Sequence, residues 1–260
     1  MERRLVFGET AEEYDAHRPG YPAELVDDVV AAAGPGPALE VGARTGKATV
    51  AFAARGLDLT ALEPDPRMVA VLRRRIADLP RVRVVEALFE DWTPDRPYGL
   101  IVSGQAWHWI DENRRNGLAA AALAPGGRLA LFWNASLLAD HRVHAALAEV
   151  DERFGLECTP HSRLAAEHPR LNLDDFAADW PTLHLDGDDR FTDLRSRRYR
   201  RTRSLTSTEY ADVAATTSHY RVLPPNVRTE ALDAIVAAID AEGGVIRMIV
   251  DTDLALATRV

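Results

Sequence analysis

The sequence lacks several features that would define a special class of protein. It has one cysteine, Cys158, in 260 residues, which excludes a disulfide framework or a cysteine-based zinc cluster and fits a reducing compartment. No stretch approaches the roughly 18 apolar residues of a membrane span, and no apolar segment follows residues 1–5 as a secretory signal requires. The 16 glycines and 15 prolines are too few and too scattered for a disordered chain. These absences predict a soluble, cytoplasmic protein with no membrane partner.

The balance of charge is acidic. The chain has 31 lysines and arginines against 40 aspartates and glutamates, for a formal net charge of −9. Such a balance disfavours nucleic acid as a partner. The length fits one large α/β domain or two small ones. Because no stretch rich in glycine, proline or serine marks a linker, we expect a single domain over residues 1–260.

The first half alternates short apolar runs with amphipathic segments. The pattern predicts helices over residues 22–33, 46–55, 66–76 and 118–123, and strands over 38–41, 57–62, 82–85, 100–102 and 129–133. Asp65 is suited to cap the third of these helices, with Pro66 at its first position. Strands that alternate with helices indicate βαβ units and a mostly parallel sheet covered on both faces.

The second half is less regular. We expect helices over 137–154, 208–216 and 228–241, short helices within 162–180, and strands over 190–205 and 246–258. The predicted fold is therefore a doubly wound α/β fold with a mostly parallel seven-stranded sheet and helical insertions around strand six.

The turn after the first strand is the strongest signal of a ligand site. Residues 39–48 read as a strand, a turn with Gly42 and Gly46, and a helix start, and ligands of open α/β sheets lie at the carboxyl ends of strands. A P-loop needs four residues between its glycine and the Gly-Lys pair, followed by serine or threonine. Here three residues separate the glycines and Ala48 follows Lys47, which disfavours a triphosphate. A dinucleotide fingerprint needs a glycine where this chain has Arg44, which weakens a nicotinamide reading.

S-adenosylmethionine is the third ligand, with a ribose and an adenine but no phosphate. It requires the tight turn and an acidic residue for the ribose hydroxyls. Glu63 ends the second predicted strand and lies 21 residues after Gly42, near the spacing of about 20 for a ribose-binding acid. The alternative is that Glu63 caps the next helix, although Asp65 already suits that role.

Three motifs resemble the class I S-adenosylmethionine-dependent methyltransferases, whose fold is Rossmann-like. They are Glu40-x-Gly42-x-x-x-Gly46, Glu63-Pro64-Asp65-x-x-Met68 and Gln105-Ala106-Trp107-His108-Trp109. Phe7-Gly8, Tyr14-Asp15, Arg18-Pro19-Gly20-Tyr21-Pro22 and Thr252-Asp253-Leu254 narrow the resemblance to a bacterial small-molecule branch, methyltransferase-domain-11 or trans-aconitate-methyltransferase-like. The resemblance covers essentially the whole chain. It implies a lid and first helix in 1–37, a cofactor-binding core in 38–134, and helical insertions with the last two strands in 135–260.

The resemblance also implies a set of cofactor-binding residues. Glu40, Gly42 and Gly46 would shape the pocket for the methionine part, Glu63 would bind the ribose, and residues 87–90 would line the adenine. The full set is Tyr14, Arg18, Glu40, Gly42, Ala43, Gly46, Glu63, Pro64, Met68, Leu88, Phe89 and Gln105.

Two residues depart from the family pattern. Arg44 stands where relatives usually have a glycine, and it fits there at a backbone cost of about 1 kcal/mol if its side chain points to solvent. Leu88 stands where many relatives have an aspartate, so the adenine amino group would need the backbone, Glu90 or Asp91. These departures leave open the alternative that the protein binds the cofactor but does not transfer its methyl group. A nicotinamide-dependent oxidoreductase is a further alternative.

The chemistry of methyl transfer needs few catalytic groups, because the methyl donor is already activated. His108 is the candidate general base, or else a histidine that only packs and binds backbone. Trp107 and Trp109 are candidate walls of the acceptor site, with Trp107 as the candidate acceptor contact, or else core residues. Six arginines within residues 195–203 either receive an anionic acceptor, with Arg201 as the candidate contact, or pair with acids such as Asp193. We predict a small-molecule acceptor, anionic if Arg200 or Arg201 points inward, with O-methylation favoured and no metal site.

Overall fold

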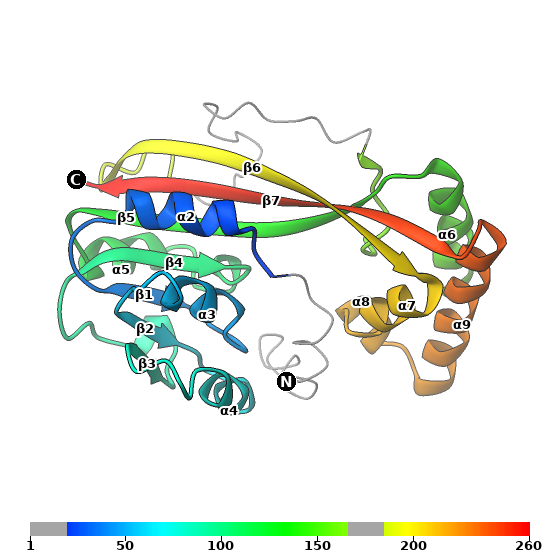
Figure 1. Cartoon of the computed structure of the whole chain (residues 1–260), viewed down its shortest axis with the longest axis horizontal. Helices are drawn as coiled ribbons and strands as arrows, with labels where there is room; N and C mark the ends of the chain where they lie inside the picture. The colour runs from blue at the N-terminus through cyan, green and yellow to red at the C-terminus, as the bar shows by residue number, and fades with distance from the viewer. Residues whose placement is uncertain (1–19, 166–184) are drawn as a thin grey trace.

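The computed structural model describes residues 20–165 and 185–260. Seven strands form one sheet in the order β3-β2-β1-β4-β5-β7-β6, with helices on both faces (Figure 1). The pairs from β3 to β5 are parallel, and β7 runs antiparallel to both β5 and β6. The predicted seven-stranded, mostly parallel α/β fold is confirmed.

The first half follows the predicted alternation closely. Its elements are α2 (Ala23–Ala32), β1 (Ala38–Val41), α3 (Lys47–Ala53), β2 (Leu59–Leu62), α4 (Pro66–Arg75), β3 (Val82–Val85), the 3-10 turn η2 (Phe89–Asp91), β4 (Tyr98–Gly104), the 3-10 turn η3 (Trp107–Trp109) and α5 (Arg115–Ala122). The Asp65 side chain accepts a hydrogen bond from the backbone N–H of Arg67, and Pro66 occupies the first turn of α4, as predicted.

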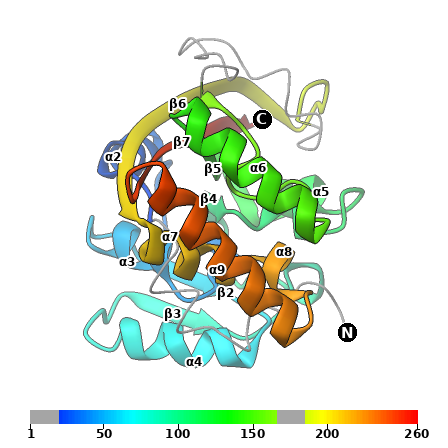
Figure 2. The same ribbon diagram turned by 90° about the vertical axis from the view of Figure 1, so that its right-hand side faces the viewer.

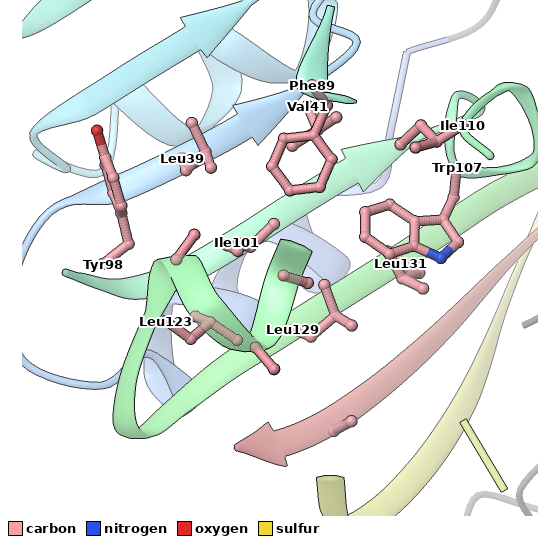
Figure 3. Close-up of a cluster of buried hydrophobic side chains, with 14 of the residues drawn as sticks. Leu39, Val41, Phe89, Tyr98, Ile101, Trp107, Ile110, Leu123, Leu129 and Leu131 are labelled. Atoms are coloured by element: carbon pink, nitrogen blue, oxygen red, sulfur yellow. The ribbon is translucent and has the colours of Figure 1, made fainter. Parts of the chain in front are cut away.

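Two hydrophobic clusters cover the two faces of this part of the sheet. On one face, α2 and α3 pack on β4 and β5 through residues such as Leu25, Phe52 and Phe132. On the other face, α5 and the η3 turn pack on β1, β4 and β5, and Figure 3 shows Trp107, Ile110 and Leu131 within that cluster. Every residue of β1, β2 and β4 is buried, as expected for central parallel strands.

The last three strands extend beyond the parallel part of the sheet. These strands are β5 (Leu123–Leu138), β6 (Phe191–Thr206) and β7 (Val245–Arg259). Figure 1 shows them reaching a group of helices at the far end, and Figure 2 shows these helices in front of the sheet. The helices are α6 (His141–Phe154), α7 (Ser207–Ala215), α8 (Ser218–Arg221) and α9 (Pro225–Ala241). They bury their own hydrophobic cluster, which includes Leu147, Ile235 and Met248.

The fifth strand and the following helix were predicted with wrong boundaries. The strand covers residues 123–138 rather than 129–133, and the helix begins at His141 after an Asp140 cap rather than at residue 137. Leu137 and Leu138 pair with Ile249 and Met248 of β7, so distant strand pairing overrides the local helical pattern. Short helices were expected within 162–180. Residues 166–180 lie outside the described residues, and Leu164 forms a parallel bridge to Leu138.

Candidate functional site

Two neighbouring pockets lie at the carboxyl ends of β1, β2 and β4. The first is lined by Val41, Gly42, Arg44, Leu62, Glu63, Pro64, Met68, Ala87, Leu88, Phe89, Glu90, Ala106, Trp109 and Ile110. The second is lined by Tyr21, Glu40, Gly42, Ala43, Arg44, Thr45, Lys47, Ala48, Gly104, Gln105, Asn134 and Ser136. With the open space at their mouths included, they enclose about 630 and 590 Å³, within the range of small-molecule sites.

Glu63 is the acidic residue of the first pocket. It is 5% exposed, and its two carboxylate oxygens accept backbone N–H bonds from Arg44, at 2.7 Å, and from Asp65, at 3.0 Å. Burial raises the pKa of this carboxyl, while the two backbone bonds and the Arg44 charge act in the opposite direction. A carboxylate has about four acceptor positions, so each oxygen keeps one for a further donor. This arrangement fits a pair of neighbouring hydroxyls.

The turn between β1 and α3 brings backbone close to the neighbouring strand. Gly42 has φ 75°, and a Cβ there would lie 2.3 Å from the Cβ of Ala106. Gly46, the N-cap of α3, has φ 89°, and a Cβ there would lie 2.5 Å from Leu72. Both positions therefore require glycine. Gly42 lines both pockets, whereas Gly46 acts on them through the shape of the turn.

Arg44 does not meet the condition of a side chain that points to solvent. It is half-buried with φ 52°, it lines both pockets, and its Nη2 donates a 2.9 Å hydrogen bond to the main-chain carbonyl of Gln105. The bond holds the guanidinium against the β4–η3 turn. A carbonyl in the β4–η3 turn, 61 residues away, provides an acceptor that local sequence does not reveal.

The first pocket is otherwise mainly apolar. It is lined by four of the predicted cofactor-binding residues, Pro64, Met68, Leu88 and Phe89. Their apolar side chains suit contact with a flat aromatic ring such as adenine. Of the two acids expected to replace an aspartate at position 88, Glu90 lines the pocket, while Asp91 is exposed and outside its lining. Glu90 already accepts a hydrogen bond from the Asp111 backbone N–H.

The second pocket is more polar and contains a buried acid. Glu40 is 2% exposed and accepts a 2.6 Å hydrogen bond from the Thr49 hydroxyl. Burial raises the pKa of Glu40 to about 8, against the lowering effect of Thr49 and with a further rise from Glu63. Glu40 is therefore mostly protonated at pH 7. Ala43 and Gln105 line this pocket as predicted cofactor-binding residues.

Several lining residues were not predicted. The second pocket includes Tyr21, Lys47, Asn134 and Ser136. Their positions at the carboxyl ends of strands or at a helix start were the available signal. Tyr14 and Arg18 of the predicted set lie outside the described residues.

His108 lies in η3 beside Trp109, with ring centroids 4.9 Å apart, and it is in the lining of neither pocket. Its Nδ1 accepts a 3.3 Å hydrogen bond from the Trp133 indole N–H, so the neutral ring carries its proton on Nε2. The side chain reaches the surface, but the surrounding protein still desolvates it. This desolvation and the positive charges of Arg44 and Arg115 together lower the pKa of His108 to about 4. The imidazole is thus neutral at pH 7 and a weak base, which makes it a poorer general base than its residue type predicted.

Trp107 lies in the hydrophobic core and not on a pocket wall. It is fully buried and belongs to the cluster around Leu131 (Figure 3). The neighbouring indole, that of Trp109, lines the first pocket instead. The core alternative for Trp107 therefore agrees with the structure better than the acceptor-wall alternative.

The arginine-rich segment forms the edge strand β6, and most of its arginines pair with acids. Arg195 pairs with Asp193, Arg197 with Asp28, Arg198 with Asp253 and Arg200 with Asp251. This agrees with the ion-pairing alternative, and charged side chains also protect an edge strand against pairing with other chains.

Arg201 differs from the paired arginines. Its Nη2 donates a 2.8 Å hydrogen bond to the Gly20 carbonyl, beside Tyr21 of the second pocket. Its buried Nε has no hydrogen-bond partner. Within residues 20–165 and 185–260, no cluster of three or more histidine, cysteine or acidic side chains could hold a metal ion. Over the same ranges, no helix is both long and apolar enough to cross a membrane.

The chain is similar to known methyltransferases. A family described as a methyltransferase domain matches residues 38–127. An uncharacterized methyltransferase of Mycobacterium tuberculosis is 32% identical over 233 residues, which are 89% of this chain and 84% of the relative, and one of Mycobacterium bovis matches equally. A solved structure from Anaeromyxobacter dehalogenans, described as a candidate type II methyltransferase, superposes with a TM-score of 0.57 at 18% identity, covering 92% of this chain and 97% of that one.

Proposed function

Because the chain belongs to the class I methyltransferase family, we propose that it binds S-adenosylmethionine across the two pockets and methylates a small anionic molecule. The observation that carries the cofactor assignment is the Glu63 carboxylate, buried at the end of β2 with one acceptor position left on each oxygen. Ribose hydroxyls donate to Glu63, and the adenine packs against Met68 and Phe89 in the apolar part of the first pocket. When bound, the cofactor supplies a methyl group on a positively charged sulfur.

The methionine part belongs in the second pocket. Its walls combine the protonated Glu40 and cationic Lys47 with the neutral polar groups of Gln105 and Asn134. These groups can bind both the amino and the carboxylate end of an amino acid. The close approach of Gly42 to Ala106 keeps the passage between the pockets free of side chains on that side.

A carboxylate is the acceptor group that the surroundings favour. A carboxylate is nucleophilic at neutral pH and needs no base, which agrees with the low pKa of His108 and with the Trp133 N–H on its Nδ1. We assign His108 to the rim of the acceptor site, with its Nε2–H available to donate. Arg201, beside Gly20 and Tyr21, is the candidate contact for the anion. O-methylation follows from this choice of acceptor.

Calorimetric titration with S-adenosylmethionine, S-adenosylhomocysteine and NADH tests the cofactor. Glu63→Gln keeps an acceptor for one backbone N–H and removes the charge, so we expect the Kd of both sulfur ligands to rise about a hundredfold. Asp91→Asn, an exposed acid outside the pocket lining, is the control and leaves both values within about twofold. Equal affinities in the wild type and Glu63→Gln would refute the site, and preferential NADH binding would refute the cofactor.

The anionic acceptor is tested on Arg201. Arg201→Ala raises the KM for a carboxylic acid acceptor found by screening, while the Kd of S-adenosylmethionine stays the same. Arg195→Ala, an exposed ion pair on the same strand, leaves both unchanged. An unchanged KM in Arg201→Ala, or a loss of cofactor affinity with it, would remove Arg201 from the acceptor site. We place the reaction in the cytoplasm, in keeping with the single cysteine, and propose no nucleic-acid partner.

A further inference from the structure

Figure 1 shows α2 lying along the sheet beside β7 and β6, and a groove runs between these three elements. With the open space at its mouth included, the groove encloses about 900 Å³, within the range of small-molecule sites. Among the described residues, none lines both this groove and either pocket at the carboxyl ends of the strands. A molecule bound in the groove would therefore occupy a second site, apart from the proposed cofactor site.

Short side chains on α2 leave the groove open. Asp28, Ala31 and Ala32 line it, and positions three and four apart share one face of a helix. The two alanines are too short to cover the strand beneath them, where Leu254 and Leu256 of β7 form the floor. Leu254 is buried, but Leu256 is only half-buried and Ala31 is exposed. The floor therefore offers an apolar surface that a ligand can cover.

The outer wall of the groove is the edge strand β6. Arg195, Arg197 and Tyr199 line it, since alternate residues of a strand point to the same face. Arg197 lies opposite Leu254 and marks one end, where its guanidinium forms an ion pair with Asp28. The Tyr199 hydroxyl donates a hydrogen bond to the same carboxylate. The charges at this end of the groove are therefore balanced.

The other end of the groove has an excess of positive charge. Arg195 lies there opposite Leu256, and its ion pair with Asp193 is exposed, with the two side chains 69% and 41% accessible. Exposed pairs of this kind contribute little free energy, so a ligand anion can compete for the guanidinium. Arg128 donates to the Ala32 carbonyl at the same end and has no carboxylate partner among the described residues. Two cations are thus offset by one carboxylate, and this end attracts an anion.

We propose that the groove is a second ligand site, which binds a small anion with an apolar body, such as a medium-chain fatty acid. The carboxylate binds the Arg195 guanidinium, whose planar donors match two carboxylate oxygens. The chain lies on Leu254 and Leu256 and against Ala31, so that protein and ligand both bury apolar surface. An inorganic anion lacks the apolar body and a neutral alcohol lacks the charge, so each binds more weakly than the amphipathic anion.

The probe is octanoate, titrated calorimetrically into the whole protein below the concentration at which octanoate forms micelles. Arg195→Gln removes the charge at the positive end, and Ala31→Phe fills the groove from an exposed position of α2. We expect the Kd of octanoate to rise about tenfold or more in each variant, while the Kd of S-adenosylmethionine stays the same. Octanol and inorganic phosphate, titrated into the wild type, should each bind about tenfold more weakly than octanoate or weaker still.

The matched controls replace exposed residues of α6, outside the groove. Arg142→Gln and Ala148→Phe should leave the Kd of octanoate unchanged. Arg201→Ala should do the same, because the proposed acceptor contact is not part of the groove lining.

Four outcomes contradict the proposal. Octanoate that does not bind the wild type, a Kd that is unchanged in Arg195→Gln or in Ala31→Phe, or octanol that binds as tightly as octanoate would overturn it. A loss of octanoate binding in Arg201→Ala would place the fatty acid in the acceptor site instead. Each of these results leaves the proposed cofactor site unaffected, and the melting temperature of each variant establishes that it is folded.

Discussion

Arg44 and Gln105 are joined by a 2.9 Å hydrogen bond from the guanidinium of the first to the carbonyl of the second, and both adopt a positive φ, 52° and 59°. Such a conformation costs a residue other than glycine about 1 kcal/mol or more. The Gln105 backbone N–H bonds to Phe132, its side chain bonds to the Asn134 carbonyl, and the Arg44 N–H bonds to Glu63. The surrounding sheet thus holds two strained residues in the wall of one pocket, as strained residues at functional sites generally require.

Gly42→Ala should be more destabilising than an alanine at another glycine of the same φ. Gly42 and Gly126 both have φ 75°, but a Cβ at Gly42 would lie 2.3 Å from the Cβ of Ala106, whereas none of the described atoms lies within 4 Å at Gly126. We expect a loss in the free energy of unfolding of about 3 kcal/mol at Gly42 and about 1 kcal/mol at Gly126. Urea unfolding measures both, and equal losses would show that the contact with Ala106 relaxes freely.

Glu40 should make the folded protein less stable as the pH rises from 5 to 8. Its pKa is about 8 in the folded state against an ordinary value of 4.5, so between these values the folded state binds more protons than the unfolded state. Stability is then fully present below pH 4.5 and falls towards pH 8, by about 3 kcal/mol from Glu40 over this window. Glu63, whose pKa burial also raises, adds a change of the same sign.

The test for Glu40 is Glu40→Gln, which keeps the acceptor for Thr49 and cannot ionise. Urea unfolding at pH 5, 6, 7 and 8 should give a markedly flatter profile for this variant than for the wild type. Asp91→Asn, an exposed acid, serves as the control and should preserve the wild-type slope. A variant profile as steep as that of the wild type would mean that Glu40 does not carry the pH dependence.

His108→Asn should lower kcat by less than tenfold. With a pKa of about 4 and its Nδ1 bonded to Trp133, His108 is neutral above pH 5, and its lone pair is already engaged. Loss of a true general base typically lowers the rate by 10² to 10⁴. The check is kcat/KM from pH 5 to 8 with a carboxylic acid acceptor, and a limb near pH 6.5 that disappears in the variant would restore His108 as the base.

Asp251→Asn should strongly destabilise the long antiparallel part of the sheet. Asp251 is completely buried and accepts hydrogen bonds of 2.7 and 2.6 Å from the Arg200 guanidinium. Removing its charge leaves a poorly compensated arginine, at a cost of about 3 kcal/mol. Asp193 and Arg195 form an exposed ion pair on β6. Asp193→Asn should therefore lower the free energy of unfolding by under about 1 kcal/mol. Thermal and urea unfolding compare the two, and similar losses would mean that solvent reaches Asp251.

Local sequence signals were sufficient where a residue's role depends on its immediate neighbours. Gly42 and Gly46 were predicted as turn residues and adopt positive φ. Glu63 was predicted at the end of the second strand, and its carboxylate is buried in a pocket wall there. The cofactor-binding roles of these residues stay predictions, to be tested by titration.

The parallel part of the sheet, the turn after β1 and the acid after β2 could be predicted from the residues alone, because apolar periodicity and turn residues act over a few positions along the chain. The length of β5, the different surroundings of Trp107 and Trp109 in η3 and the direction of Arg44 became known only from the folded chain. Each of these depends on a distant partner: β7 for the strand, the core around Leu131 for Trp107, and the Gln105 carbonyl for Arg44. Contacts between segments that only folding brings together produce no periodic pattern in the sequence of either segment.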